Sequence, residues 1–214
     1  MGDGGDGRVR PSRTSASGSA SGRLDASVVL EAGDMGRTID RDGETKLQSL
    51  PAVGGAVRAA VPVVPGLEMG PALQVAGLRM RKPSHLTGEL RALDLGIWMS
   101  LVDQLPGAAF YLGLRPALTV LFPDNDEVCR AVQRENSAVT DCDALPAVSF
   151  STALRVGARR RVGPVGLFIE LGAAFRILRG RTEVSLGSGL PFSSTAVVGT
   201  IQLTAAAGVA FDLP

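Results

Sequence analysis

Two cysteines carry the most reactive side chains of this 214-residue chain, and both lie in one polar segment between apolar stretches. They are Cys129 and Cys142. In an exported protein, a pair this close in sequence is expected to form a disulfide around a loop of about a dozen residues, worth on the order of 3 kcal/mol by chain entropy. In a cytosolic protein, the same pair would be two reduced, exposed thiols. We expect the disulfide if the chain is exported.

The same segment is rich in carboxylates, which are the ligands that Ca²⁺ prefers. Its acidic residues are Asp124, Asp126, Glu127, Asp141 and Asp143. They lack the ordered spacing and the central glycine of a calcium loop, and the two cysteines lack neighbouring histidines that would complete a tetrahedral zinc site. We therefore expect a solvated polar loop and no metal.

Catalytic motifs find little support in the sequence. His85 is the only histidine and follows Ser84 directly. Because adjacent residues on an extended segment point apart, these two do not form a ready nucleophile and base. The glycines Gly187 and Gly189 belong to no phosphate-binding motif between a strand and a helix. We expect no catalytic residue, no cofactor and no enzymatic activity.

Charge and lysine usage narrow the environment of the chain. The net charge is +1, which gives no basis for nucleic-acid binding. Lys46 and Lys82 are the only lysines among the 22 basic residues, and both fall between the predicted strands. A soluble sheet usually carries lysine on its wet face or edges, so this absence indicates that neither face meets bulk water. A GC-rich genome explains the arginine bias equally well.

Charged residues recur on one face of strand-length segments. Along residues 164–178, Leu167, Ile169 and Leu171 alternate with small residues and Glu170, and successive side chains of a strand point to opposite faces. The polar face of the eight segments carries about one charge per strand: Glu31, Arg58, Asp94, Arg115, Arg155 and Glu170. Buried charges must be paired, so we predict an ionic network of these six in a barrel lumen. Alternatively, they are solvated on one side of a sandwich.

Eight such segments set the predicted architecture. They cover residues 24–33, 53–64, 68–80, 90–102, 108–122, 147–160, 164–178 and 197–211. The linkers at 65–66, 103–107 and 162–163 are short, whereas those at 34–52, 81–89, 123–146 and 179–196 are long. Membrane barrels have short turns at one rim and longer loops at the other. We predict an all-β fold, an eight-stranded antiparallel up-and-down transmembrane β-barrel with both termini on the periplasmic side.

Two irregularities interrupt this pattern. In the third segment, Leu78 and Met80 switch parity, and a bulge would restore the phase. Pro62, Pro71 and Pro116 fall inside predicted strands, although proline cannot donate to a ladder. We expect bulges or strand ends at these prolines.

The first 23 residues are predicted to be a disordered tail or linker, followed by the barrel domain over 24–214. The segment is rich in Gly, Ser and Arg and has no apolar core of a signal peptide. A start codon assigned too far downstream, or the loss of an upstream domain, would each reconcile this tail with export.

With this pattern, residues 24–213 resemble the small outer-membrane β-barrels of bacteria, the OmpA-type and OmpW-type eight-stranded proteins. Members end in a C-terminal assembly signal, and Gly208, Phe211 and Leu213 stand at matching places, with Ala206 where a polar residue is usual. The resemblance implies a porin-like protein of the cell envelope, located in a Gram-negative outer membrane. It also implies contact with the lipid of that membrane and with the barrel assembly machinery. It implies a role as scaffold, adhesin or passage for a small apolar solute.

A rival interpretation comes from a different class of protein. The same alternation fits a soluble β-barrel or sandwich that binds a small apolar ligand, with the oily face turned inward. Leu167, Ile169 and Leu171 would then form a core, while Arg115 and Glu170 would face water. The sequence does not indicate an oligomeric state.

Overall fold

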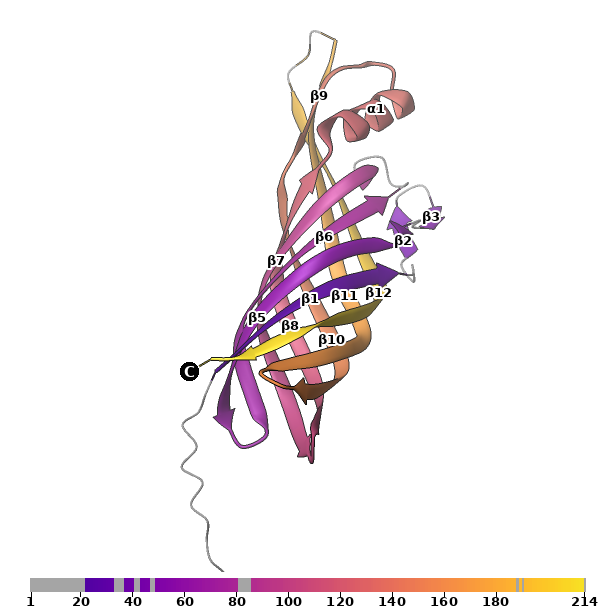
Figure 1. The fold of residues 1–214 in the computed structure, drawn as a ribbon. Coiled ribbons are helices and arrows are strands. Elements are labelled where there is room, and N and C mark those ends of the chain that lie inside the picture. The colour runs from indigo at the N-terminus through magenta and orange to yellow at the C-terminus, as the bar shows by residue number, and fades with distance from the viewer. Residues whose placement is uncertain are drawn as a thin grey trace, which may run out of the picture.

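Eight long antiparallel strands form a closed ring in the computed structural model, which describes residues 22–32, 37–40, 43–46, 49–80, 86–187, 189 and 191–213 (Figure 1). The strands are β1 (Arg23–Ala32), β5 (Ala52–Val64), β6 (Leu67–Met80), β7 (Gly88–Leu105), β8 (Ala108–Pro123), β10 (Ala147–Val162), β11 (Val165–Leu186) and β12 (Phe192–Asp212). Each pairs with the next, and β12 pairs with β1 to close the ring. This confirms the predicted eight-stranded up-and-down barrel.

Smaller elements extend the end of the ring opposite the short turns (Figure 1). They are the hairpin of β2 (Arg37–Asp40) and β3 (Gly43–Lys46), the short strand β4 (Ser49–Leu50), the helix α1 (Asn125–Glu135) and the strand β9 (Val139–Leu145). Strand β9 pairs with the outer part of β11. The prediction of a plain loop over 123–146 is therefore wrong, since this linker folds into α1 and β9. In the described residues, no helix is long and apolar enough to cross a membrane.

Three tight turns connect strand pairs at the other end of the ring. They lie at Pro65 and Gly66, at Pro106 and Gly107, and at Gly163 and Pro164. Each glycine has a positive φ, of 80°, 81° and 62° respectively, which L-residues with a side chain rarely adopt. The expected turn at 103–107 shortens to two residues because Leu105 still pairs with Ala108.

The outside of the ring is apolar and the inside is polar. On β11, Leu167, Ile169 and Leu171 are 50, 64 and 63% exposed, whereas Phe168 and Glu170 between them are buried. A closed ring leaves no unpaired sheet edge, and an apolar exterior suits hydrocarbon. The rival interpretation needs the oily face turned inward, so its arrangement of the faces is wrong.

The parity switch at Leu78 is not a bulge. The pairing of β6 with β7 keeps one register from Leu67 to Met80, and Leu78 is a buried interior residue. The expected bulge is therefore wrong, because the interior itself becomes apolar at this height.

The in-strand prolines stand at interruptions of the ladder. The β5–β6 register shifts between Pro62 and Val64. The paired positions of that ladder also skip Pro71, and those of the β7–β8 ladder skip Pro116. Pro71 and Pro116 are thus each unpaired on one side while they pair with Ile97 and Thr152 on the other, and Pro62 pairs with Glu68 directly before the register shift.

Candidate functional site

The barrel interior holds a buried cation at the centre of a polar cluster. Arg176 on β11 has no exposed surface. Its guanidinium donates to Glu31 on β1, to Asp94 Oδ2 on β7 at 2.8 Å and to Gln202 Oε1 on β12 at 3.0 Å. A charge this deep is tolerated only when it is paired and hydrogen-bonded, and here two carboxylates and an amide surround it.

Gln74 on β6 links this cluster to two further arginines. Its amide nitrogen donates to Glu31 Oε1 at 2.6 Å, and its amide oxygen accepts from Arg115 and from Arg155 Nη2, the latter at 3.0 Å. Arg115 also donates to Asp94 Oδ2 at 2.9 Å. One neutral side chain therefore joins residues from both sides of the ring.

Arg58 on β5 continues the chain of ion pairs toward the short-turn end. Its Nη1 lies 2.5 Å from Glu170 Oε1, and its Nε lies 2.7 Å from Asp25 Oδ2. The guanidinium carbon stands 4.1 Å from the centre of the Trp98 ring and 5.0 Å from that of Phe168, within cation–π range. Charge and ring faces therefore hold Arg58 from several sides.

All six residues predicted to form a lumen network lie inside the ring and are joined to one another. Four more charged or amide residues complete the set, and we call these ten the ionic network: Arg23, Asp25, Glu31, Arg58, Gln74, Asp94, Arg115, Arg155, Glu170 and Arg176. Arg23 and Asp25 share the parity of Glu31 on β1, and Arg176 shares that of Glu170 on β11, while Gln74 lies among the buried positions of β6, which carries none of the six. This parity was the available signal for finding them.

A buried apolar layer lies inside the ring on the long-loop side of the ionic network. Its residues are Ala52, Leu78, Leu86, Leu90, Ala92, Leu121, Leu178 and Val198. Leu178 follows Arg176 by two positions on β11, and Leu90 precedes Asp94 by four positions on β7. Because residues an even number of positions apart on a strand face the same side, both leucines point into the ring, on the long-loop side of these charges. Ionic and apolar residues thus fill successive levels of the same lumen.

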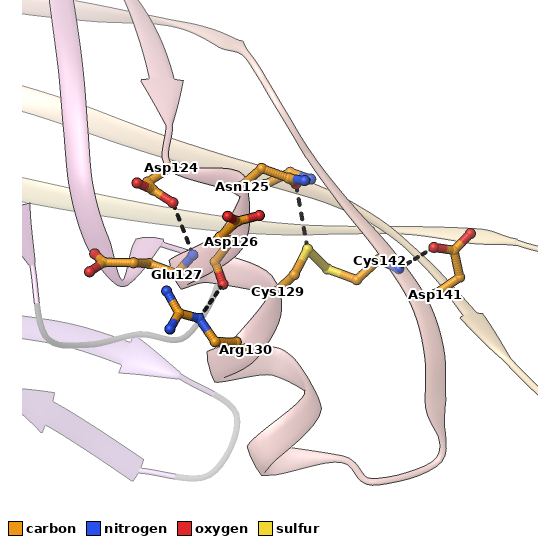
Figure 2. Close-up of a disulfide and its surroundings, with 9 residues drawn as sticks. Asp124, Asn125, Asp126, Glu127, Cys129, Arg130, Asp141 and Cys142 are labelled. Carbon is orange, nitrogen blue, oxygen red and sulfur yellow. Dashed lines mark hydrogen bonds between the residues drawn. A yellow bond between two sulfur atoms is a disulfide. The ribbon is translucent and has the colours of Figure 1, made fainter.

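The helix α1 and the strand β9 form a small module beyond this layer, which we call the outer module (Figure 2). Asp124 caps α1, since its Oδ1 accepts from the Glu127 amide at 3.0 Å. Glu127 Oε2 in turn accepts from the Glu89 amide at 3.0 Å and ties the helix to β7. A disulfide joins Cys129 of α1 to Cys142 of β9, with 5.6 Å between their Cα atoms. This confirms the predicted disulfide.

Three of the five acidic residues of this segment accept hydrogen bonds from backbone amides. Asp124 and Glu127 accept the amide hydrogen bonds above, and Asp141 Oδ1 accepts from the Cys142 amide at 3.0 Å. Buried apolar residues of the module pack together: Val128, Val132, Val139, Ala144 and Val184. In the described residues, no three His, Cys, Asp or Glu side chains are grouped to hold a metal ion. Ser84 and His85 lie outside the described residues.

The three residues of the expected assembly signal end β12 or follow it. Gly208 faces the interior, where a Cβ atom would come 2.7 Å from the Phe168 ring. Phe211 and Leu213 are exposed, and the Leu213 amide donates to the Gly22 carbonyl at 2.7 Å. Their place at the end of the closing strand is where such a signal belongs.

The ring has the fold of the small outer-membrane β-barrels. The fold is similar to the crystal structure of the outer membrane protein OprG from Pseudomonas aeruginosa, with a TM-score of 0.56 and 9% identity over 91% of this chain and 96% of that chain. It is also similar to the outer membrane protein AlkL in DMPC lipid bilayers, with a TM-score of 0.51 and 13% identity over 100% of this chain and 98% of that chain. Identities this low establish the fold alone. No protein-family model and no curated protein matches the chain.

Proposed function

We propose that the protein is an integral barrel of the Gram-negative outer membrane with a closed lumen, which anchors the outer module for a structural or loop-mediated role. The observation that carries this proposal is the filled interior beneath an apolar exterior. The role is non-enzymatic and uses no cofactor.

The closed lumen is supported by how little space the ionic network leaves. A cavity lined by Arg58, Trp98, Arg115 and Arg155 has a volume of about 10 Å³. That volume holds about one water molecule. A hydrated ion or an apolar solute would have to displace several ion pairs to pass this level.

The proposed orientation is supported by the difference between the two ends of the ring. The chain enters β1 and leaves β12 at the end that carries the three tight turns, because Arg23 pairs with both Ala60 and Asp212. Outer-membrane barrels keep short turns in the periplasm and long loops outside the cell. We therefore assign the termini to the periplasm and the outer module to the cell surface, where a disulfide persists.

Lipid and the barrel assembly machinery are the partners we propose. The exposed apolar side chains of all eight ring strands provide the lipid contact. Gly208, Phe211 and Leu213 at the end of β12 are assigned to recognition by the assembly machinery. Substituting Phe211 with Asp is expected to lower the amount of folded barrel in membranes, with protein accumulating in unfolded form.

Gel mobility and planar-bilayer recording together test the proposal. We expect the purified protein to need detergent, to shift mobility on heating in SDS gels, and to add no discrete conductance to a lipid bilayer after insertion. Protein that stays soluble without detergent and shows no shift would overturn the membrane assignment. Discrete channel openings from heat-modifiable protein would overturn the closed lumen.

A further inference from the structure

A cavity of about 280 Å³ opens at the short-turn end of the lumen. Small residues leave this space, since Gly107, Ala108, Ala109, Gly166 and Ala210 line it. The charged residues of its wall are Arg23, Arg159, Arg161 and Asp212. Three arginines and one carboxylate thus face a space large enough for a small solute.

Arg159 is the arginine of this wall that the protein satisfies least. Its Nη1 is buried and has no hydrogen-bond partner. Its nearest carboxylate oxygen, Glu68 Oε1, lies 3.7 Å from Nη2, which is too long for a hydrogen bond. Arg23 beside it donates to Asp25 at 2.7 Å and to Glu68 at 2.5 Å. Glu68 therefore binds Arg23 closely through Oε2 and Arg159 only at long range through Oε1, and Nη1 of Arg159 remains an unused donor.

The charges that face the lumen and its short-turn rim also leave one cation in excess. In the described strands, the arginines that face the lumen or its short-turn rim are Arg23, Arg58, Arg115, Arg155, Arg159, Arg161 and Arg176. The corresponding carboxylates are Asp25, Glu31, Glu68, Asp94, Glu170 and Asp212. Seven cations face six anions. The other six arginines each have a carboxylate oxygen within 3.2 Å, whereas that of Arg159 lies at 3.7 Å, so Arg159 is the most weakly paired of these cations.

An oxyanion is the ligand that suits this arrangement. A guanidinium presents a planar set of N–H donors that matches a carboxylate or phosphate group, and such charge-assisted bonds are the stronger kind. Arg161 stands on the same strand two residues away, with Asp212 Oδ2 at 3.2 Å. We propose that this cavity binds the carboxylate or phosphate group of a small solute, held by Arg159 with Arg161 at the rim.

Titration of the full-length protein in a nonionic detergent tests this site. Inorganic phosphate and acetate are added at constant ionic strength, and binding is followed by calorimetry or by NMR shifts of the arginine side chains. We expect saturable binding of at least one of these anions to the wild type and a loss of affinity of at least tenfold in Arg159→Gln. The matched control is Arg160→Gln, because Arg160 is exposed on the outside of the barrel and the change in charge is identical.

A second variant moves the affinity in the opposite direction. Glu68→Gln removes the carboxylate that competes for Arg159, while Arg23 keeps its bonds to Asp25. We expect tighter binding of the same anion, which a loss of folding would not produce. Absence of saturable binding, or equal affinity in the Arg159 and Arg160 variants, would overturn the proposal. If the protein bound short-chain phosphatidylglycerol but neither phosphate nor acetate, the assignment of the ligand as a small solute would be overturned and the ligand would be a lipid headgroup.

Discussion

Arg176 shows how a buried charge is compensated inside the ring. Each of its terminal nitrogens contacts Glu31, and further bonds run to Asp94 and Gln202, while its Nε is buried without a hydrogen-bond partner. Removing one member of a buried pair leaves the other charge uncompensated, which costs more than the pair itself contributes. The arginine therefore matters to stability chiefly through the two carboxylates that it neutralises.

We expect Arg176→Met to lower the free energy of unfolding by about 3–5 kcal/mol, because Glu31 and Asp94 lose their common partner. The matched control is Arg179→Met on the same strand, whose side chain is exposed; a change within about 0.5 kcal/mol is expected there. Urea unfolding in lipid vesicles, followed by the heat-modifiable gel shift, measures both. Equal stability of the two variants would contradict a paired lumen.

Parity predicted which face each charge occupies, but it could not predict which charges meet. Glu31, Arg58 and Glu170 could be assigned to the lumen because alternation along one strand is local. Arg176 has the same parity, yet its partners on β1, β7 and β12 are brought together only by ring closure and strand stagger. The bridging role of Gln74 depends on the same closure.

At the scale of the strands, glycines make room for the interior rings. A Cβ atom at Gly113 on β8 would collide with the ring of Trp98, and one at Gly157 on β10 would collide with that of Tyr111. Both contacts lie across neighbouring strands. Small residues of the polar face thus have a packing role besides fitting a narrow lumen.

We expect Gly113→Ala to destabilise the barrel by about 1–3 kcal/mol, since the added methyl displaces Trp98 from Arg58. Gly77→Ala makes the same chemical change on the outside of β6, where the atom nearest to an added Cβ is the Val53 carbonyl oxygen at 3.9 Å. No loss is expected for that control. Unfolding midpoints in urea compare the two, and a similar loss in both would contradict the packing role.

The outer module should respond to reduction while the ring does not. Cys129 and Cys142 are 13 residues apart, so removal of the disulfide costs the module about 3 kcal/mol. We expect Cys129→Ser with Cys142→Ser to speed tryptic cleavage at Arg130 or Arg134 of α1. The heat-modifiable shift should persist, because the ring strands are paired without the module. Loss of the shift would show that the module is needed for the ring to form.

Segment order and strand positions could be predicted because an oily and a small polar face alternate within the membrane-spanning part. The extension of β11 to Leu186 could not, since beyond Leu178 its pairing with β9 and β12 no longer requires an oily face. Helix α1 did leave a signal: Asp124 as cap and buried Val128 and Val132 at a spacing of four. The acidic composition of that linker favoured a loop instead.

At the scale of the whole molecule, three levels share one lumen. The anion cavity lies at the short-turn end, the ionic network lies across the middle, and the apolar layer separates the network from the outer module. The oily exterior surrounds these levels without an edge. The account therefore depends on one claim, that the alternation places the oily set against lipid and the polar set inside.

The single tryptophan allows this claim to be measured directly. Trp98 is 1% exposed and lies inside the ring, whereas Ile169 is 64% exposed on the outside. The comparison uses vesicles of phospholipids with brominated chains, since bromine quenches tryptophan fluorescence only at short range. We expect weak quenching of the wild type. We expect strong quenching of the double variant Trp98→Phe/Ile169→Trp, whose single tryptophan is at position 169. Strong quenching of Trp98 together with a protected tryptophan at position 169 would contradict the account.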